Sequence, residues 1–375
     1  FNGPAQDGVG FYQVTQRGGR RCSAADAYLR PALGRPNLTV QTDALVTRIG
    51  LESGRAAVVD YLHGGAEETA RVEREVLLAG GAVNSPQLLM LSGIGPADHL
   101  RELGIAVAVD SPGVGANLCD HPIVTAMWHT PKVRNLWEQA GPASLLRWQL
   151  AHSGPLVTNV AEAGGFSRSE PGLPAPDLQW HALPVPYENQ GLTDPAKRAL
   201  SLLVTLVAVR SRGQITLHSA DPRHKPAIDP GYLTDGADIE PLVAGLKMAR
   251  EFAAAKPMAK ICASEFAPGA DVSADVELRE FIRQNLATHY HPVGSCAMGG
   301  DSRLAGSRLT SVVDPELKVR GVDGLRVVDA SVMPAVPRGN TNAPVIAIAE
   351  RAADLIAGRA PLASADLEQV AALVP

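Results

Sequence analysis

Two histidines near the end of the chain have a spacing that could serve chemistry. His289 and His291 lie in the segment THYHPVGSCAMG, residues 288–299. One interpretation is a zinc site, although no acid or cysteine cluster with ligand spacing accompanies the pair. A second is a pair of structural histidines in the core or in a loop. A third is a general base, because imidazole is the side chain that titrates nearest to neutral pH.

An acid and a small residue follow a predicted apolar strand at GLRVVDA, residues 324–330. Asp329 and Ala330 stand at the carboxyl end of this strand, which is where open α/β sheets bind ligands. A polar loop after a core strand is the simpler alternative. The strand is therefore a candidate ligand-binding edge.

Three polar residues precede a helix predicted over residues 342–358. Asn340, Thr341 and Asn342 lie in the segment PRGNTNAP, just before or at the start of this helix. Free N–H groups and the helix dipole attract negative charge at such a position. Plain helix capping is the alternative, and it would account for one of the three residues.

Composition excludes several classes of protein. The 375-residue chain has 34 basic and 39 acidic side chains, a net charge of −5 and no basic block, so nucleic-acid binding is not expected. No membrane span is expected, because no run of about 20 apolar residues is present. The four cysteines form no CxxC pair, which argues against a disulfide framework and a thiolate metal site and favours a reducing, cytoplasmic location. The absence of a GxSxG motif excludes that type of serine hydrolase, and a small-molecule partner remains the default.

The elements that must position these residues change in type along the chain. A hairpin turn is predicted at Ser53-Gly54, and residues 70–95 predict a strand, a turn and a helix of α/β type. Residues 120–284 contain all four tryptophans and predict a second domain inserted into the first. Within this domain we expect two antiparallel strands over residues 200–219 and an amphipathic helix over residues 239–255.

Four segments, in this order, closely resemble the glucose-methanol-choline (GMC) family of flavin oxidoreductases. They are GAVNSPQLLMLSGIG at 81–95, GVGANLCDHP at 113–122, THYHPVGSCAMG at 288–299 and a long segment at 312–356. The resemblance implies FAD as the cofactor and an alcohol as the substrate. It also implies oxidation to an aldehyde or ketone by hydride transfer to flavin N5, with an electron acceptor that the segments do not identify.

The resemblance implies an α/β fold of mixed α+β character. A Rossmann-like FAD/NAD(P)-binding domain would be joined to a substrate domain that has a mainly antiparallel sheet and helices. The expected divisions are residues 1–36 as a strand and helix leading into the FAD domain, 37–119 and 286–360 as parts of the FAD domain, 120–285 as the substrate domain and 361–375 as a C-terminal tail.

The resemblance carries roles over to single residues. His291 resembles the catalytic histidine that accepts the hydroxyl proton, and Asn342 resembles its partner, which would orient the alcohol oxygen. The positions expected to contact FAD are Val46, Asn117, Asp329, Ala330, Asn340 and Thr341.

Two further residues are similar to substrate-contacting positions of the choline-oxidising members. An acid at Glu162 would meet the quaternary ammonium group, and a histidine at His181 would line the pocket. Aromatic residues make up only 4% of the chain, so no dense aromatic cage for a cation is visible. Glu162 as a structural carboxylate is the alternative, and both choline and aliphatic alcohols remain possible substrates.

One part of the family pattern is not found. Family members begin with a strand, a GxGxxG turn and a helix that hold the ADP half of FAD, whereas residues 1–19 contain only scattered glycines. The sequence therefore predicts a C-terminal fragment without the first βαβ unit of the Rossmann-like domain. The alternative function is a flavin-free fragment that acts as a binding module or is inactive.

Overall fold

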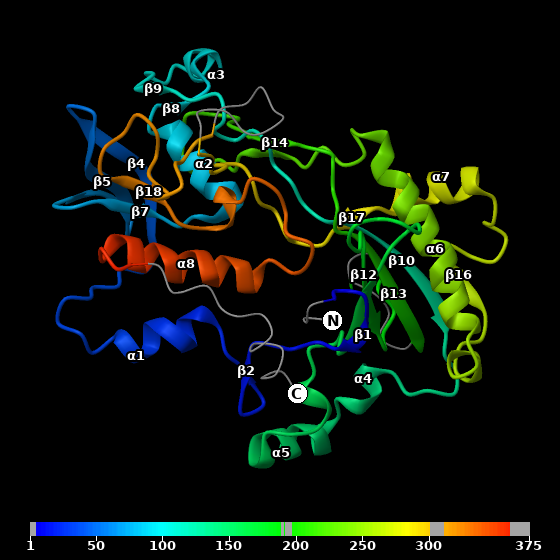
Figure 1. Ribbon diagram of the computed structural model, residues 1–375. Coiled ribbons are helices and arrows are strands. Elements are labelled where there is room, and N and C mark those ends of the chain that lie inside the picture. Colours follow the sequence, from blue (N-terminus) through cyan, green and yellow to red (C-terminus); the bar gives the residue numbers. More distant parts are fainter. Residues whose placement is uncertain (1–4, 189–190, 192–196, 301–310, 361–375) are drawn as a thin grey trace.

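The computed structural model describes residues 5–188, 191, 197–300 and 311–360, which form two adjoining regions (Figure 1). The first region is built on a seven-stranded antiparallel sheet. Its strands, in sheet order, are β1 (Gly8–Phe11), β11 (Ala163–Ser167), β12 (Leu178–Leu183), β13 (Ala199–Leu206), β10 (Pro122–His129) and β16 (Glu265–Ala267), with β17 (Ala287–Thr288) paired to β10. Every residue of β13 is buried, because both faces of this strand are covered by other parts of the chain.

Helices α6 (Ile239–Ala254) and α7 (Asp275–Asn285) pack beside this sheet (Figure 1). The buried side of α6 includes Leu242, Leu246 and Ala249, so the amphipathic helix predicted over residues 239–255 is confirmed. Gly245 allows α6 to approach the sheet closely, because a Cβ atom there would lie 2.3 Å from Cγ1 of Val204. Apolar packing of α6 on β13 forms the core of the first region.

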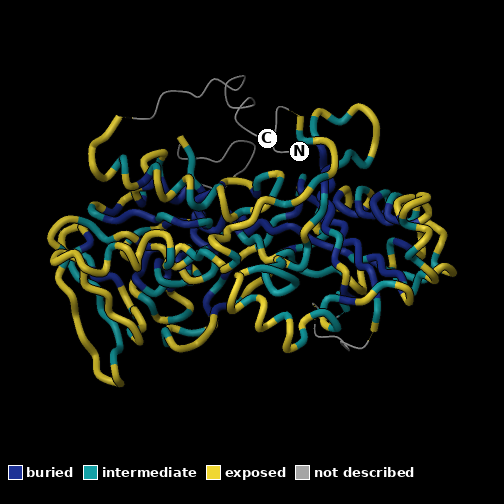
Figure 2. The backbone as a smooth tube through the Cα atoms, turned by 90° about the horizontal axis from the view of Figure 1, so that it is seen from below, coloured by how far each residue is buried: buried dark blue, intermediate teal, exposed yellow. Residues whose placement is uncertain are grey.

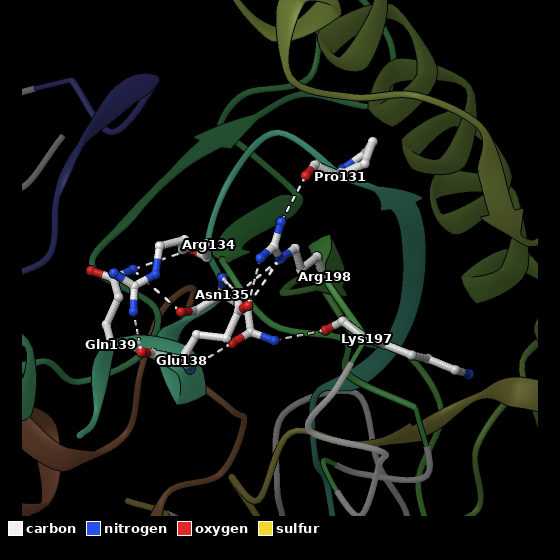
Figure 3. A network of polar contacts seen from close by, with 7 residues as sticks. All are labelled: Pro131, Arg134, Asn135, Glu138, Gln139, Lys197 and Arg198. Atoms are coloured by element: carbon white, nitrogen blue, oxygen red, sulfur yellow. Dashed lines mark hydrogen bonds and ion pairs between the residues drawn. The ribbon is translucent and has the colours of Figure 1, made fainter.

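A polar network joins α4 (Leu136–Gln139) to the start of β13 (Figure 3). Asn135 caps α4, since its side chain accepts the Glu138 N–H at 2.8 Å and the Glu138 carboxylate accepts the Asn135 N–H at 2.9 Å. The guanidinium of Arg198 donates to the same carboxylate at 2.7 Å and to the Pro131 carbonyl at 2.9 Å. These bonds hold the pKa of Glu138 below its usual range and fix the segment that leads into α5 (Pro142–Ala151).

The second region contains two parallel strands, β7 (Val76–Leu78) and β18 (Leu325–Val327), with helices α2 (Gly81–Leu91) and α8 (Asn342–Ile356). A separate antiparallel sheet is formed by β4 (Ala44–Glu52), β5 (Arg55–His63) and β6 (Ala66–Arg71). The predicted turn at Ser53-Gly54 joins β4 to β5 and is confirmed, with φ values of 51° and 81°. Both are left-handed values, which a two-residue hairpin turn of this kind requires.

The smaller elements connect these layers. They are β2 (Gln16–Arg17), β3 (Arg20–Arg21), the helical turn Ala25–Leu29 with α1 (Arg30–Ala32), β8 (Ile94–Gly95), α3 (Ala97–Glu102), β9 (Val109–Asp110), β14 (Gln214–Thr216), β15 (Ala227–Asp229) and the short turns Pro155–Val157, Gly236–Asp238, Met258–Lys260 and Ala330–Val332. β1 comes from the first 36 residues but pairs with β11, so it belongs to the sheet of the first region.

The prediction of two paired strands over residues 200–219 is wrong. β13 pairs with β10 and β12, whereas β14 pairs with β15. The buried carboxylate of Asp238 accepts the backbone N–H groups of Arg210 at 3.0 Å and Ser211 at 2.8 Å. Those N–H groups are therefore bound outside any sheet, and the chain leaves the first region before β14 begins.

Buried backbone runs through the interior of both regions, and exposed backbone is concentrated in the loops at the rim (Figure 2). The second region has its own apolar core, which includes Ile49, Leu89, Met90 and Val327. In the described part of the chain, no helix combines the length and apolar character needed to cross a lipid bilayer.

Candidate active site

Four histidines from three distant parts of the sequence lie close together in the structure. We call His121, His181, His289 and His291 the histidine cluster. The ring centroids of His289 and His291 lie 4.5 Å apart, those of His181 and His289 4.6 Å, and those of His121 and His291 5.2 Å. β12 contributes His181, while the pairing of β17 with β10 brings residues 289–291 beside His121. The spacing of these histidines along the sequence therefore does not predict that they lie together.

A buried carboxylate holds the cluster in place. Asp120 accepts the backbone N–H groups of His121 and His291, each at 2.8 Å. It also accepts the hydroxyl of Thr288 at 2.5 Å and the phenol of Tyr232. Asp120 is only 4% exposed, so water screens its electrostatic interactions with neighbouring groups very little. The two histidine-bearing segments are thus fastened through one side chain.

Burial keeps the imidazoles of the cluster neutral at pH 7. Desolvation, assisted by the neighbouring histidines, lowers the pKa of His121 and His181 to about 3 and that of His289 to about 2. Desolvation also lowers the pKa of His291, but the Asp120 carboxylate opposes this effect. His291 is therefore the member of the cluster whose conversion to imidazolium has a counter-charge beside it.

The structure brings Asn340, and not Asn342, to His291. The Asn340 amide nitrogen Nδ2 lies 3.3 Å from His291 Nε2. Asn342 is the first residue of α8, and its amide donates instead to the Thr15 hydroxyl at 3.2 Å. Asn342 therefore makes no side-chain contact with His291 among the described hydrogen bonds, and its expected catalytic role stays a prediction.

The two expected substrate contacts are placed differently. His181 is buried, and its ring stacks on Tyr12 with centroids 4.8 Å apart. Its Nδ1 atom has no hydrogen-bonding partner among the described residues, and neither does the buried Oε1 atom of Gln179. Glu162 is exposed, and no contact found in the described chain joins its carboxylate to the histidine cluster. The cluster therefore offers polar atoms, but not this carboxylate, to a ligand.

The acid at the end of β18 is used within the protein. The buried Asp329 carboxylate accepts the N–H of Gly81 at 2.9 Å and the hydroxyl of Ser85 at 2.6 Å. It also accepts the N–H of Ser331 at 2.8 Å and its hydroxyl at 2.5 Å. Asp329 thereby ties the end of β18 to the start of α2. Ala330 follows it directly and begins the turn Ala330–Val332.

The backbone after β7 is open to a ligand. Ala79 and Gly80 are exposed, and Gly81 has a φ of 80°. A Cβ atom built on Gly81 would meet no atom within 4 Å. We call residues 79–81 and 328–330, at the parallel ends of β7 and β18, the carboxyl edge. Such an edge is where ligands approach open α/β sheets.

The remaining predicted cofactor contacts differ in character. Asn117 is buried, and its amide donates to the Pro334 carbonyl at 3.1 Å while its oxygen accepts from Arg212 Nε at 3.1 Å. Val46 lies in β4 opposite Tyr61 and is 36% exposed. Thr341 precedes α8 but makes no capping hydrogen bond through its side chain. A ligand contact by Asn117 would therefore involve its backbone, since its side chain is already bonded.

Several residues of the site are not marked by any pattern in the sequence. Asp120 and His121 stood in the segment that indicated the family, but no spacing rule linked them to His291. Tyr12 and Gln179 had no distinguishing pattern. Within the described ranges, no group of three or more His, Cys, Asp or Glu side chains is arranged to hold a metal ion.

Comparison with known proteins defines the class. Two family models, both described as GMC oxidoreductase, match residues 1–123 and 209–349. The chain is 43% identical over 373 residues to an alcohol dehydrogenase [acceptor] of Pseudomonas putida, covering 98% of this chain and 66% of that protein. It is 41% identical over 374 residues to an oxygen-dependent choline dehydrogenase of Rhizobium etli, covering 98% and 67%. The chain belongs to the GMC oxidoreductase family.

Solved structures agree with the fold. A formate oxidase of Aspergillus oryzae superimposes with a TM-score of 0.85 at 26% identity, covering 94% of this chain and 66% of that one. The predicted α/β fold with an antiparallel sheet is thus confirmed. The N-terminal family model matches residues 1–123, so the prediction of a fragment without the family's N-terminal part, and of an incomplete Rossmann-like domain, is not supported. The chain spans 61–67% of the length of the curated relatives that it matches.

Proposed function

We propose that the protein oxidises an alcohol to an aldehyde or ketone with FAD, and that His291 is the general base. The observation that carries the proposal is the position of His291 Nε2, 3.3 Å from the Asn340 amide nitrogen. A neutral imidazole and an amide donor at one point suit a hydroxyl group, which donates to the first and accepts from the second. The names of two relatives, an alcohol dehydrogenase and a choline dehydrogenase, support this class of reaction.

The residues present fit an FAD. The open backbone at Gly81 and the carboxyl edge would accommodate the extended part of the cofactor, with Asp329 and Ala330 contributing through the backbone. The first N–H groups of α8 have no acceptor within a helix, and the helix dipole favours negative charge at this end. Asn340, which precedes α8, touches His291, so α8 would present these groups close to the base.

When bound, FAD supplies the acceptor of the substrate hydride. The protein's own residues accept the hydroxyl proton of the substrate. His291 is neutral at pH 7, because desolvation lowers its pKa, and it takes the hydroxyl proton at Nε2. The buried Asp120 carboxylate, which accepts the His291 backbone N–H, stabilises the resulting imidazolium. Asn340 donates to the alcohol oxygen and holds it beside the base.

An uncharged alcohol fits this site better than choline does. The histidine cluster is neutral, and the Asp120 carboxylate is occupied by four donors from the protein. A quaternary ammonium group buried here would lose hydration without gaining a free carboxylate or an aromatic cage from the described residues. We therefore propose His181 as a wall of the substrate site and leave Glu162 outside it. The flavin-free binding module is not favoured, because models of both parts of the family match the chain.

The test is the replacement His291→Ala in the flavin-loaded protein. Loss of a general base should slow anaerobic flavin reduction by alcohol by about 10²- to 10⁴-fold, while the flavin content stays the same. His218→Gln is the matched control, because His218 is exposed and lies outside the cluster. Unchanged flavin reduction in His291→Ala would show that another group accepts the proton. Choline, an aliphatic alcohol and an aromatic alcohol, compared in the same assay, test the proposed preference for an uncharged substrate.

A further inference from the structure

A hydrogen bond near the start of the chain has a defined direction. The Tyr12 hydroxyl lies 2.5 Å from the Trp180 backbone carbonyl, which can only accept. Tyr12 must therefore donate its single proton there. The amide nitrogen of Gln179 lies 3.3 Å from the same phenol oxygen, which is left to accept. The orientation of the Gln179 amide is thereby set by a backbone carbonyl.

The orientation of the Gln179 amide in turn sets the orientation of the Asn340 amide. The Gln179 Nε2 group also donates to Asn340 Oδ1 at 2.8 Å. With its oxygen used as an acceptor, Asn340 presents its NH₂ group to His291 Nε2. An N–H donor needs a lone pair opposite it, so Nε2 of neutral His291 carries no proton.

The other nitrogen of His291 must then carry the proton. His291 Nδ1 lies 3.0 Å from His121 Nδ1, so the Nδ1–H of His291 donates to an unprotonated His121 Nδ1. His121 is left with its proton on Nε2. Burial lowers the pKa of His121 to about 3. The buried Nε2 atom of His121 has no hydrogen-bonding partner among the described residues.

We propose that Tyr12, Gln179 and His121 are positioning residues that select the Nδ1–H tautomer of His291 through one directional chain of hydrogen bonds. The hydrogen-bond chain leaves Nε2 of His291 unprotonated, so that it can accept the proton of an alcohol hydroxyl that takes the place of the Asn340 N–H. The inference rests on that function for its catalytic meaning, but not for the tautomer itself. None of the three residues touches the reacting atoms in this account.

The hydrogen bonds from Tyr12 to His121 keep the same donors and acceptors across the neutral pH range. The groups that face His291 are Asp120, His121, His181, His289 and Asn340. The pKa values of the three other histidines lie far below 7, so these rings do not become donors on both nitrogens. Desolvation raises the pKa of Tyr12 to about 12, so its hydroxyl proton is retained.

The experiment measures the tautomer directly. In protein labelled with ¹⁵N-histidine, two-bond ¹⁵N–¹H spectra at pH 7.5 distinguish a protonated ring nitrogen from an unprotonated one. His291 should show protonated Nδ1 and unprotonated Nε2, with its signals assigned by their loss in His291→Ala. A His291 protonated at Nε2 in the unaltered protein would overturn the proposal.

Tyr12→Phe removes one oxygen atom and keeps the ring that stacks on His181. Without the phenol, the Gln179 amide can turn over, and the tautomer ratio of His291 should shift by about five- to tenfold toward Nε2–H, the value of one hydrogen bond. An unchanged tautomer ratio of His291 would contradict the proposed series of hydrogen bonds. His218→Gln, at an exposed position, should leave the ratio as it is.

A pair of substitutions at His121 tests its role as the acceptor of the His291 Nδ1–H. His121→Gln retains a side-chain acceptor for the His291 Nδ1–H and should preserve the tautomer, whereas His121→Leu should not. Equal spectra for the two variants would overturn the role of His121. If the spectra follow the proposal but His291→Ala retains full activity, the tautomer selection stands and the proposed function fails. The two failures are therefore distinguishable.

Discussion

In the histidine cluster and the adjoining Gln179, buried atoms of His121, His181 and Gln179 have no partner in the described chain. At the carboxyl edge, by contrast, the Asp329 carboxylate accepts four hydrogen bonds from the protein. A buried polar atom without a partner is costly, so one that persists marks a place for a ligand. A carboxylate whose hydrogen bonds are all made within the protein has a structural role. Side-chain atoms are therefore available to a ligand at the histidine cluster, whereas at the carboxyl edge the backbone at Gly81 is open to one.

The largest expected effect on stability comes from breaking the fastening at the carboxyl edge. Asp329→Ala leaves the bonded groups of Gly81, Ser85 and Ser331 without their acceptor, and we expect the free energy of unfolding to fall by about 3 kcal/mol. Urea denaturation measures this loss. Glu102→Ala, at an exposed position of α3, is the control and should leave stability unchanged. Turnover per bound flavin should stay near normal; a selective loss of turnover in stable protein would assign Asp329 to the chemistry instead.

A smaller effect, on rate alone, separates Asn340 from Asn342. Removing the amide that faces His291 in Asn340→Ala should lower turnover by about 10²-fold, the value of one well-placed donor. Asn342→Ala removes only the bond to Thr15 and should change turnover little. Steady-state kinetics with the flavin content matched would decide between them. The reverse order of effects would restore Asn342 as the partner of His291.

The smallest effect for each residue is the dependence of stability on pH. His121, His181 and His289 are held neutral in the folded protein, with pKa values of about 3, 3 and 2. Below the unfolded value of about 6.5, the unfolded chain binds more protons, so stability falls as the pH drops. Each histidine should cost about 2 kcal/mol between pH 6.5 and pH 5.

Urea titrations at pH 7.5, 6.5 and 5.0 measure this dependence. His181→Gln should flatten the slope, whereas His218→Gln, which is exposed, should leave it unchanged. A slope that is the same in all three proteins would mean that the cluster is not the source of acid sensitivity.

Local pattern predicted much of the fold. The turn at Ser53-Gly54 and the helix at residues 239–255 were predicted correctly, because hairpin chemistry and helical periodicity are local properties. The paired strands over residues 200–219 were wrong, because Asp238, a residue far along the chain, binds the backbone that would have formed the turn. The predicted domain limits, cofactor contacts and catalytic roles stay predictions.

The sequence by itself determined the family, the types of the main elements and His291 as a candidate base, since these follow from ordered motifs and short-range pattern. Only the tertiary structure decided that Asn340, Asp120 and His121 contact His291. It also decided that Gln179 joins Asn340 to Tyr12. The physical reason is that hydrogen bonds with a defined direction join residues up to 171 positions apart, and strand pairing, not spacing, brings them together.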